Sequence, residues 1–171
     1  MQTQLCEFCL KSGMLCSKCQ TKLKTGVVSS EYIDTAKKLL SLEPQNQFLQ
    51  SISLNNAVEA GGFLVLVVGK GDSNKFNANQ KFVREFGDSI DKRLLVIETG
   101  MNDRKFLEEL FAGQQIVTIN IIWLPDGSTE TRAVLSSTGS KKLSKKRIQG
   151  LVDISKKVRN MDLRVEYANL N

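Results

Sequence analysis

The sequence contains no histidine, and none of its four cysteines lies beyond residue 19. Without histidine, the chain lacks the side chain that most often acts as a general base near neutral pH, which argues against an enzyme. A metal ion bound at the cysteines would have to be held by four thiolates. No apolar stretch approaches the roughly 18–20 residues of a membrane span, so we expect no membrane partner. Low-complexity segments are absent too, which predicts a chain folded over most of its length.

Two closely spaced cysteine pairs open the chain, in the pattern C-x2-C-x6-C-x2-C. Two intervening residues place the sulfurs of each pair about 3.5–4 Å apart, as a tetrahedral thiolate site requires. We therefore predict a structural Zn²⁺ site with the ligands Cys6, Cys9, Cys16 and Cys19. Four thiolates leave no open coordination position, so the ion would organise the fold and not catalyse. Two disulfides, an iron–sulfur cluster and a redox pair are the alternatives.

No signal peptide precedes the first cysteine, at position 6, which predicts an intracellular and cytoplasmic protein. Thiols stay reduced in that compartment. The expected location therefore favours a metal ion over disulfides.

Positive charge is concentrated at the two ends of the chain, whose net charge is +6. Residues 132–171 carry ten Lys/Arg against three acids, and residues 1–30 carry four lysines against one glutamate. The middle, residues 31–131, carries ten basic and fourteen acidic side chains. Such asymmetry predicts a polyanionic partner, with nucleic acid first. A solvated Lys-rich surface is the alternative.

Hydrophobic periodicity predicts an α+β protein. We expect helices at 30–43, 81–90, 103–113 and 141–158. Strands are expected at 53–60, 63–69, 94–100, 115–124, 128–135 and 162–167. The polar stretch GKGDSNKFNANQ (69–80) is expected to be a connecting loop. The order helix, strand, strand, helix, strand thus occurs twice, at about 43–98 and 102–168.

Most aromatic side chains have the spacing of core positions, and this prediction covers Phe82, Phe86, Phe106, Phe111 and Trp123. Phe76 is different because it interrupts a polar stretch, where it would either anchor the loop or stack on a base. Phe8, between the cysteines, is a second candidate for exposure.

The repeated element order is typical of KH domains, in which a GxxG loop clamps the backbone of about four nucleotides. In the first repeat, Asn77 and Gln80 occupy the two glycine positions; in the second, Ser144 and Arg147 do. Neither loop is a GxxG, and we expect polar and basic side chains to replace the clamp. The alternatives are a polar turn that merely connects elements in the first repeat and a solvated basic face in the second. The predicted RNA-binding residues are Lys75, Asn77, Ala78, Asn79, Gln80 and Lys81 in the first repeat, and Lys141, Lys142, Ser144, Lys145, Lys146 and Arg147 in the second.

Two stretches carry a resemblance to a known family: FLVLVVGKGDSNKFNANQKFVREFG with LLVIETG, and DRKFLEELFAGQQIVTINIIWLPDGSTETRAVL with the terminal helix and strand. They resemble the paired KH domains of NusA, the transcription elongation and termination factor, in its small archaeal form. The cysteine-rich start is similar to the zinc-ribbon-bearing branch of that family. The resemblance implies a zinc-binding knob at 1–28 and two type II KH-like units (αββααβ), at 29–99 and 100–171, packed in tandem.

The resemblance also implies a non-catalytic RNA-binding protein that contacts nascent RNA and works with RNA polymerase. A second hypothesis is a ribosome-associated factor whose altered KH units dock on rRNA and proteins of a ribosomal subunit. A third is a protein-binding adaptor that has lost RNA binding altogether.

The motif GxxxxGK[ST] of phosphate-binding loops is absent, since the lysine of GKGDSNK precedes the second glycine.

Overall fold

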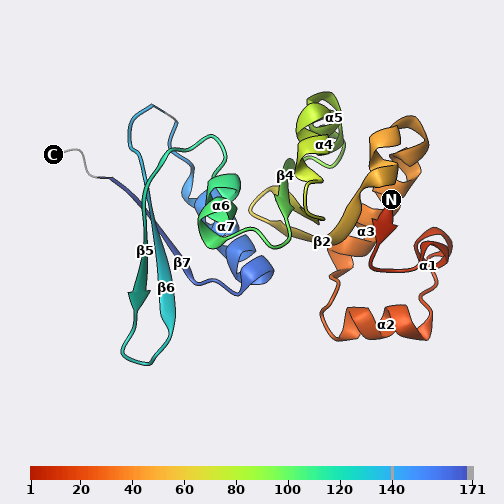
Figure 1. The fold of residues 1–171 in the computed structure, drawn as a ribbon, viewed down its shortest axis with the longest axis horizontal. Helices are drawn as coiled ribbons and strands as arrows, with labels where there is room; N and C mark the ends of the chain where they lie inside the picture. The colour runs from red at the N-terminus through yellow and green to blue at the C-terminus, as the bar shows by residue number, and fades with distance from the viewer. Residues whose placement is uncertain (140, 169–171) are drawn as a thin grey trace. The chain divides into compact units, whose positions relative to one another are not determined.

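A computed structural model describes residues 1–139 and 141–168, which form an α+β protein (Figure 1). The strands are β1 (Gln2–Thr3), β2 (Ser53–Ala60), β3 (Phe63–Val68), β4 (Arg93–Glu98), β5 (Ile116–Trp123), β6 (Thr129–Leu135) and β7 (Leu163–Tyr167). The α-helices are α1 (Glu7–Ser12), α2 (Ser17–Lys24), α3 (Ser30–Leu42), α4 (Ser73–Ala78), α5 (Gln80–Ser89), α6 (Asp103–Leu110) and α7 (Lys145–Arg159). Two short 3₁₀ turns, η1 (Glu43–Gln45) and η2 (Gln47–Ser51), follow α3. The predicted α+β class is confirmed.

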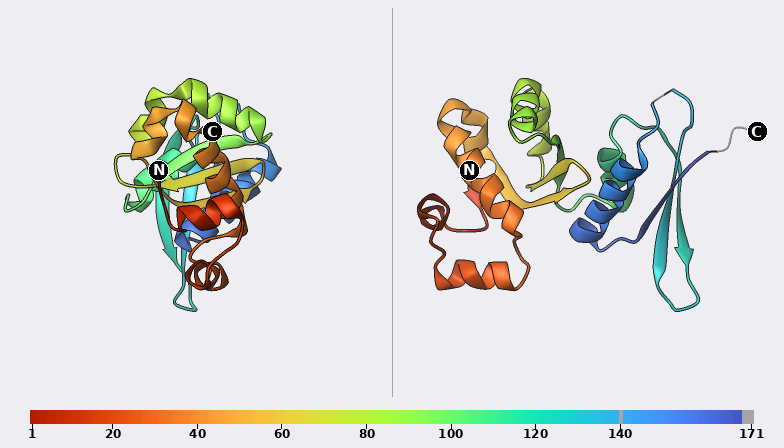
Figure 2. Two further views of the ribbon diagram at one scale, coloured as in Figure 1. Left: turned by 90° about the vertical axis from the view of Figure 1, so that its right-hand side faces the viewer. Right: turned by 180° about the vertical axis from the view of Figure 1, so that it is seen from behind.

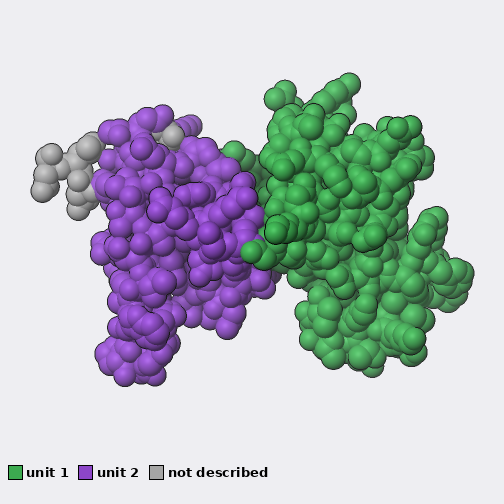
Figure 3. All heavy atoms as spheres, viewed as in Figure 1, with its two compact units in different colours: residues 1–59, 64–100 green, residues 60–63, 101–171 purple. Residues whose placement is uncertain are grey.

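The chain divides into two compact units (Figure 3). The first comprises Met1–Glu59 and Leu64–Gly100, and the second comprises Ala60–Phe63 and Met101–Asn171. No helix within the described ranges is long and apolar enough to cross a membrane.

The first unit contains a four-stranded sheet in the order β1-β2-β3-β4. Gly61 and Gly62, both at positive φ, join β2 to β3, and a connection this short requires antiparallel neighbours. The chain then crosses through α4 and α5 to β4. Because the Thr99 N–H donates to the Val68 carbonyl (2.9 Å), the C-terminal ends of β3 and β4 lie together, as in a parallel pair.

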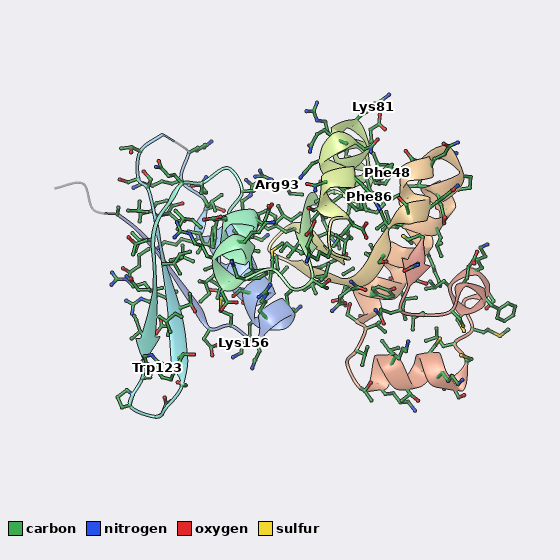
Figure 4. The ribbon with its side chains drawn as sticks, viewed as in Figure 1. Phe48, Lys81, Phe86, Arg93, Trp123 and Lys156 are labelled. Atoms are coloured by element: carbon green, nitrogen blue, oxygen red, sulfur yellow. The ribbon has the colours of Figure 1, made fainter. Side chains whose placement is uncertain are left out.

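An aromatic cluster joins η2 to α4 and α5. The ring of Phe48 packs edge-on against Phe76 (5.6 Å between centroids) and Phe82 (5.2 Å), and Phe82 stacks on Phe86 (5.7 Å; Figure 4). Phe76 is buried, so it is an anchor and not a stacking platform. It lies in α4, a helix where the sequence predicted only a loop.

Two buried carboxylates hold α4 in place. Asp72 accepts hydrogen bonds from the Ser53 backbone N–H (2.8 Å) and the Lys75 ammonium (2.7 Å). Glu98, at the end of β4, accepts the N–H of Ser73 at the first position of α4 (3.2 Å). Asp72 directly precedes α4 and ties the start of the helix to β2, whereas Glu98 reaches the same helix start from β4. The helix is therefore stabilised by tertiary contacts more than by its own six residues.

Residues 1–28 share the hydrophobic core of the first unit. Leu5, Cys9, Leu10 and Cys19 are all buried in it. The buried Tyr32 hydroxyl accepts the Gln4 N–H (2.7 Å) and donates to the Leu54 carbonyl (3.1 Å). The cysteine-containing segment is thus fixed to α3 and β2 by packing and by hydrogen bonds.

The second unit contains a three-stranded sheet in the order β5-β6-β7, with α6 and α7 on one face (Figures 1 and 2). β5 and β6 are antiparallel, with Ile116 opposite Leu135 and Trp123 opposite Thr129. β6 and β7 are parallel. Phe106 and Phe111 are buried, as predicted. Between β6 and α7, residues 136–139 and 141–144 form no helix.

The prediction that Trp123 is a core residue is wrong. Its side chain is 77% exposed, and Ile121 on the same strand is 59% exposed. Figures 1 and 2 show β5 and β6 extending past the helices, and Figure 4 places Trp123 near the end of this hairpin. The strand lies where it was predicted, but burial does not alternate along it: Asn120, Ile121 and Trp123 are all exposed, and only Ile116, Ile119 and Ile122 are half-buried.

Candidate metal centre and nucleic-acid interface

The four cysteines lie at the starts of two short helices. Cys6 is the N-cap of α1 and Cys16 is the N-cap of α2, while Cys9 and Cys19 lie in the first turn of each helix. The identical C-x2-C spacing produces this identical geometry, because an N-cap and the third helical residue lie on the same side of a helix start. Each pair therefore points both of its sulfurs to one side.

The sulfur atoms converge on one point. All four lie within 4.8 Å of one another, with 2.9 Å between Cys6 and Cys9 and 3.6 Å between Cys6 and Cys19. None of the four is in a disulfide. A tetrahedral zinc ion with bonds of about 2.3 Å would hold its sulfurs about 3.8 Å apart, which small side-chain adjustments here provide. The cluster can hold a metal ion, and the predicted clustering of the cysteines is confirmed.

Hydrogen bonds at the helix starts change the acidity of these thiols. The backbone N–H of Cys19, followed by the Cys19 thiol, lowers the pKa of Cys16 to about 7. The hydrogen bond with Cys6 raises the pKa of Cys9 to about 12. For Cys19, a backbone hydrogen bond with Cys6 lowers the pKa, but burial and the neighbouring thiols outweigh it and the net shift is upward.

Metal affinity should therefore fall steeply as the pH falls. Near neutral pH the thiols of Cys9 and Cys19 carry protons in the metal-free protein, since the pKa of each is raised. A metal ion must displace at least these two protons, so we expect the affinity for Zn²⁺ to drop about a hundredfold per pH unit. Competition with a chromophoric chelator, corrected for the chelator's own protonation, measures this slope. Equal affinities at about pH 6.5 and about pH 7.5 would contradict the four-thiolate site.

The basic residues predicted in the second repeat gather at the start of α7. Lys141 and Lys142 lie in the preceding loop, and Lys145, Lys146 and Arg147 form the first turn. All five are exposed, and no ion pair joins any of them to an acid in the part of the chain that the structure describes. Ser144 caps the helix by accepting the Arg147 N–H (3.3 Å). We call residues 141–147 the basic segment.

Side chains from elsewhere in the second unit hold the basic segment in place. The Tyr167 hydroxyl accepts the N–H of Leu143 (2.8 Å), and the Lys142 ammonium lies 5.2 Å from the centre of the Tyr167 ring. Gln114 donates to the carbonyl of Lys141 (3.2 Å). Sequence reasoning missed Tyr167 and Gln114 because neither has a local signal, and both lie more than twenty residues from their partners.

The other end of α7 is basic but neutralised. Lys156 pairs with Asp162 (2.8 Å), and Arg159 pairs with Asp103 (3.0 Å) while its guanidinium lies over the Phe106 ring (4.9 Å; Figure 4 labels Lys156). Lys157 is also engaged. Unpaired positive charge in this helix is thus concentrated at its N-terminal end.

The residues predicted in the first repeat lie together at the turn between α4 and α5, and Figure 4 shows Lys81 at the outer end of α5. Lys75 is occupied, since its ammonium donates to the Ser51 carbonyl (2.6 Å) and to Asp72. The Asn79 amide donates to the Lys75 carbonyl (2.8 Å), and Lys81 lies 3.8 Å from Glu85. The exposed members are Asn77, Ala78, Gln80 and Lys81.

The backbone of this turn is ordinary. No residue from 75 to 81 has a positive φ, so the turn needs no glycine. A GxxG clamp uses glycine for close approach to a nucleic-acid backbone, and this turn presents side chains there. Of the two predicted RNA-binding groups, the basic segment has more unpaired charge, because Lys75 and Lys81 of the first repeat both lie near carboxylates.

No family model and no curated protein matches the chain. Among solved structures, it is similar to the crystal structure of APE1850, with a TM-score of 0.50 and 13% sequence identity. The match covers 82% of this chain and 99% of that chain. At this identity the likeness concerns the fold alone.

Proposed function

We propose that this protein is a non-catalytic RNA-binding protein similar to NusA, with a zinc-stabilised N-terminal segment. The observation that carries the proposal is the basic segment: five exposed cations without acidic partners among the described residues, held at the start of α7. Helix N-termini carry partial positive charge, so each cation there costs about 0.3–1 kcal/mol. Bound phosphate groups would relieve this repulsion and would accept hydrogen bonds from the free N–H groups of the helix start.

The element order supports a KH-like origin for both units. From α3 to β4 the first unit reads αββααβ, with the α4–α5 turn at the position of the GxxG loop. The second unit reads αββαβ, with a parallel β6–β7 pair and with the basic segment leading into its single middle helix. In this proposal the second unit has exchanged a glycine clamp for lysine and arginine contacts to phosphate.

Zinc is the proposed ion of the cysteine cluster. Its four ligands would all be thiolates, which suits a structural site with no open coordination position. When bound, the ion would link the starts of α1 and α2. It would not take part in a reaction.

Salt dependence tests the proposed RNA binding. We expect the full-length, zinc-loaded protein to bind single-stranded RNA with an affinity that falls steeply between about 50 and 200 mM salt. Five phosphate contacts would give a slope of about −3.5 in log K against log salt, since each contact contributes about −0.7. Fluorescence anisotropy with a labelled oligonucleotide measures it.

An RNA affinity that does not respond to salt would favour the adaptor hypothesis, in which the protein has lost RNA binding. The proposed partner is RNA polymerase, with nascent RNA as the ligand. Co-purification with ribosomal subunits instead would favour the ribosome-associated factor.

A further inference from the structure

A pocket of about 410 Å³ lies between α1 and α3, within the first compact unit. Figures 1 and 2 show these two helices side by side. The pocket is lined by Leu10, Lys11, Ser12, Gly13, Lys37, Leu40 and Ser41. It includes none of the four cysteines and none of the predicted RNA-binding residues, so it is a separate feature of the surface.

The lining combines an apolar wall with one available cation. Leu40, which is half-buried, supplies the accessible apolar surface, since Leu10 is only 2% exposed. Lys11 pairs with Glu7 on its own helix, an exposed pair that contributes little and can exchange. Lys37 has no ion-pair partner in the part of the chain that the structure describes. Its ammonium lies 3.7 Å from the place where a Cβ on Gly13 would be, which puts it at the end of α1.

The end of α1 also leaves carbonyl groups without helical hydrogen-bond donors. The Gly13 N–H still donates to the Cys9 carbonyl (3.0 Å), but the next N–H, that of Met14, donates to the Ser12 hydroxyl (3.2 Å). The helix therefore stops, and the carbonyl groups of its last turn receive no N–H from a following turn. A ligand with N–H donors would satisfy these carbonyls.

Two large apolar side chains in and just after α1 are exposed. Phe8 is 73% exposed and Met14 is 72% exposed. Phe8 precedes Lys11 by three residues, so the two share a face of α1. Exposed aromatic and methionine side chains are enriched at surfaces that bind other proteins.

We propose that this pocket binds an extended peptide segment of a partner protein, rich in acidic and apolar residues. An apolar side chain of the peptide packs on Leu40, a carboxylate pairs with Lys37, and peptide N–H groups bond the last carbonyls of α1. The sugar–phosphate backbone of RNA carries neither N–H donors nor apolar side chains, so it would leave these carbonyls and the apolar surface of Leu40 without partners. These requirements favour a peptide, and the proposal does not depend on the RNA-binding role of the basic segment.

The test uses the full-length, zinc-loaded protein and a fluorescein-labelled octapeptide of alternating leucine and glutamate. We expect binding that is lost when serine replaces the leucines and also when glutamine replaces the glutamates. Lys37→Glu should weaken binding of the octapeptide at least fivefold and should improve binding of an alternating leucine and lysine octapeptide. The matched control is Lys38→Glu, which has the same charge change at the next, exposed position of α3 and lies outside the pocket.

Equal weakening by Lys37→Glu and Lys38→Glu would overturn the proposal, because it would mean general attraction to a basic surface. The proposal would also be overturned if octauridylate displaced the peptide from the wild type and Lys37→Glu abolished octauridylate binding. That result would assign the pocket to RNA. RNA affinity measured on the same variants separates the two roles. If the pocket is a peptide site, Lys37→Glu leaves RNA binding through the basic segment unchanged.

Discussion

Replacing Cys9 and Cys19 by serine together is expected to abolish Zn²⁺ binding and to unfold residues 5–28. The two helices that carry the cysteines have six and eight residues, which is too short for stability without packing or a cross-link. Both cysteines are also buried in the core of the first unit. Structural zinc contributes about 10–16 kcal/mol in zinc-finger peptides, so we expect the free energy of unfolding to fall by several kcal/mol.

Metal content by mass spectrometry and thermal unfolding by circular dichroism measure the two effects. Wild-type protein stripped by a chelator serves as the control, since it should melt at the same temperature as the double variant. Added Zn²⁺ should restore the melting temperature of the stripped wild type but not that of the double variant. If the metal-free double variant melted at the same temperature as the zinc-loaded wild type, the cysteines would not be a structural metal site.

The second large effect is expected from Lys145→Ala, Lys146→Ala and Arg147→Ala combined. These exposed cations form the first turn of α7 and lack acidic partners among the described residues, so their removal should leave the fold intact. We expect affinity for single-stranded RNA to fall at least tenfold, by a similar factor for every sequence. The salt slope should become shallower by about 2, since each lost phosphate contact removes about 0.7. Anisotropy titrations over a range of salt give both quantities.

The control variant removes the same charge from the second unit but away from the basic segment: Lys105→Ala, Lys156→Ala and Lys157→Ala. If long-range attraction to a basic protein were the whole effect, both triple variants would weaken RNA binding equally. Such equality, or an unchanged affinity in the first variant, would rule out the basic segment as the RNA site.

Local patterns in the sequence predicted most of the helices and strands correctly. Amphipathic spacing determines the helices at 30–42 and 103–110, and apolar runs at 63–68 and 94–97 determine two strands, each with little outside help. The helix α4 could not be predicted in this way. Its polar residues are typical of a turn, and its stability depends on Asp72, Glu98 and the burial of Phe76.

The sites show the same division. Cysteine spacing predicted the sulfur cluster because four residues of one type in a fixed pattern are a local signal. The run of lysines predicted the basic segment for the same reason. Tyr167, Gln114 and Lys37 could not be found, since their roles follow from contacts with distant residues. The prediction for Trp123 failed because alternation in the sequence does not show whether either face of a strand is covered, and both faces are exposed near this end of β5.

The short pairing of β1 with β2 changes how the cysteine-containing segment can behave. Gln2 and Thr3 pair with Ser53 and Leu54, and the Tyr32 hydroxyl bonds both Gln4 and Leu54. The segment between Gln4 and Tyr32 is thus a long loop whose two ends are both attached to the sheet. Losing the ion would release a tethered loop and not a free chain end. Since the two ends stay together, the entropic cost of closing the loop does not arise again when a new ion binds. The segment can therefore refold around that ion in place.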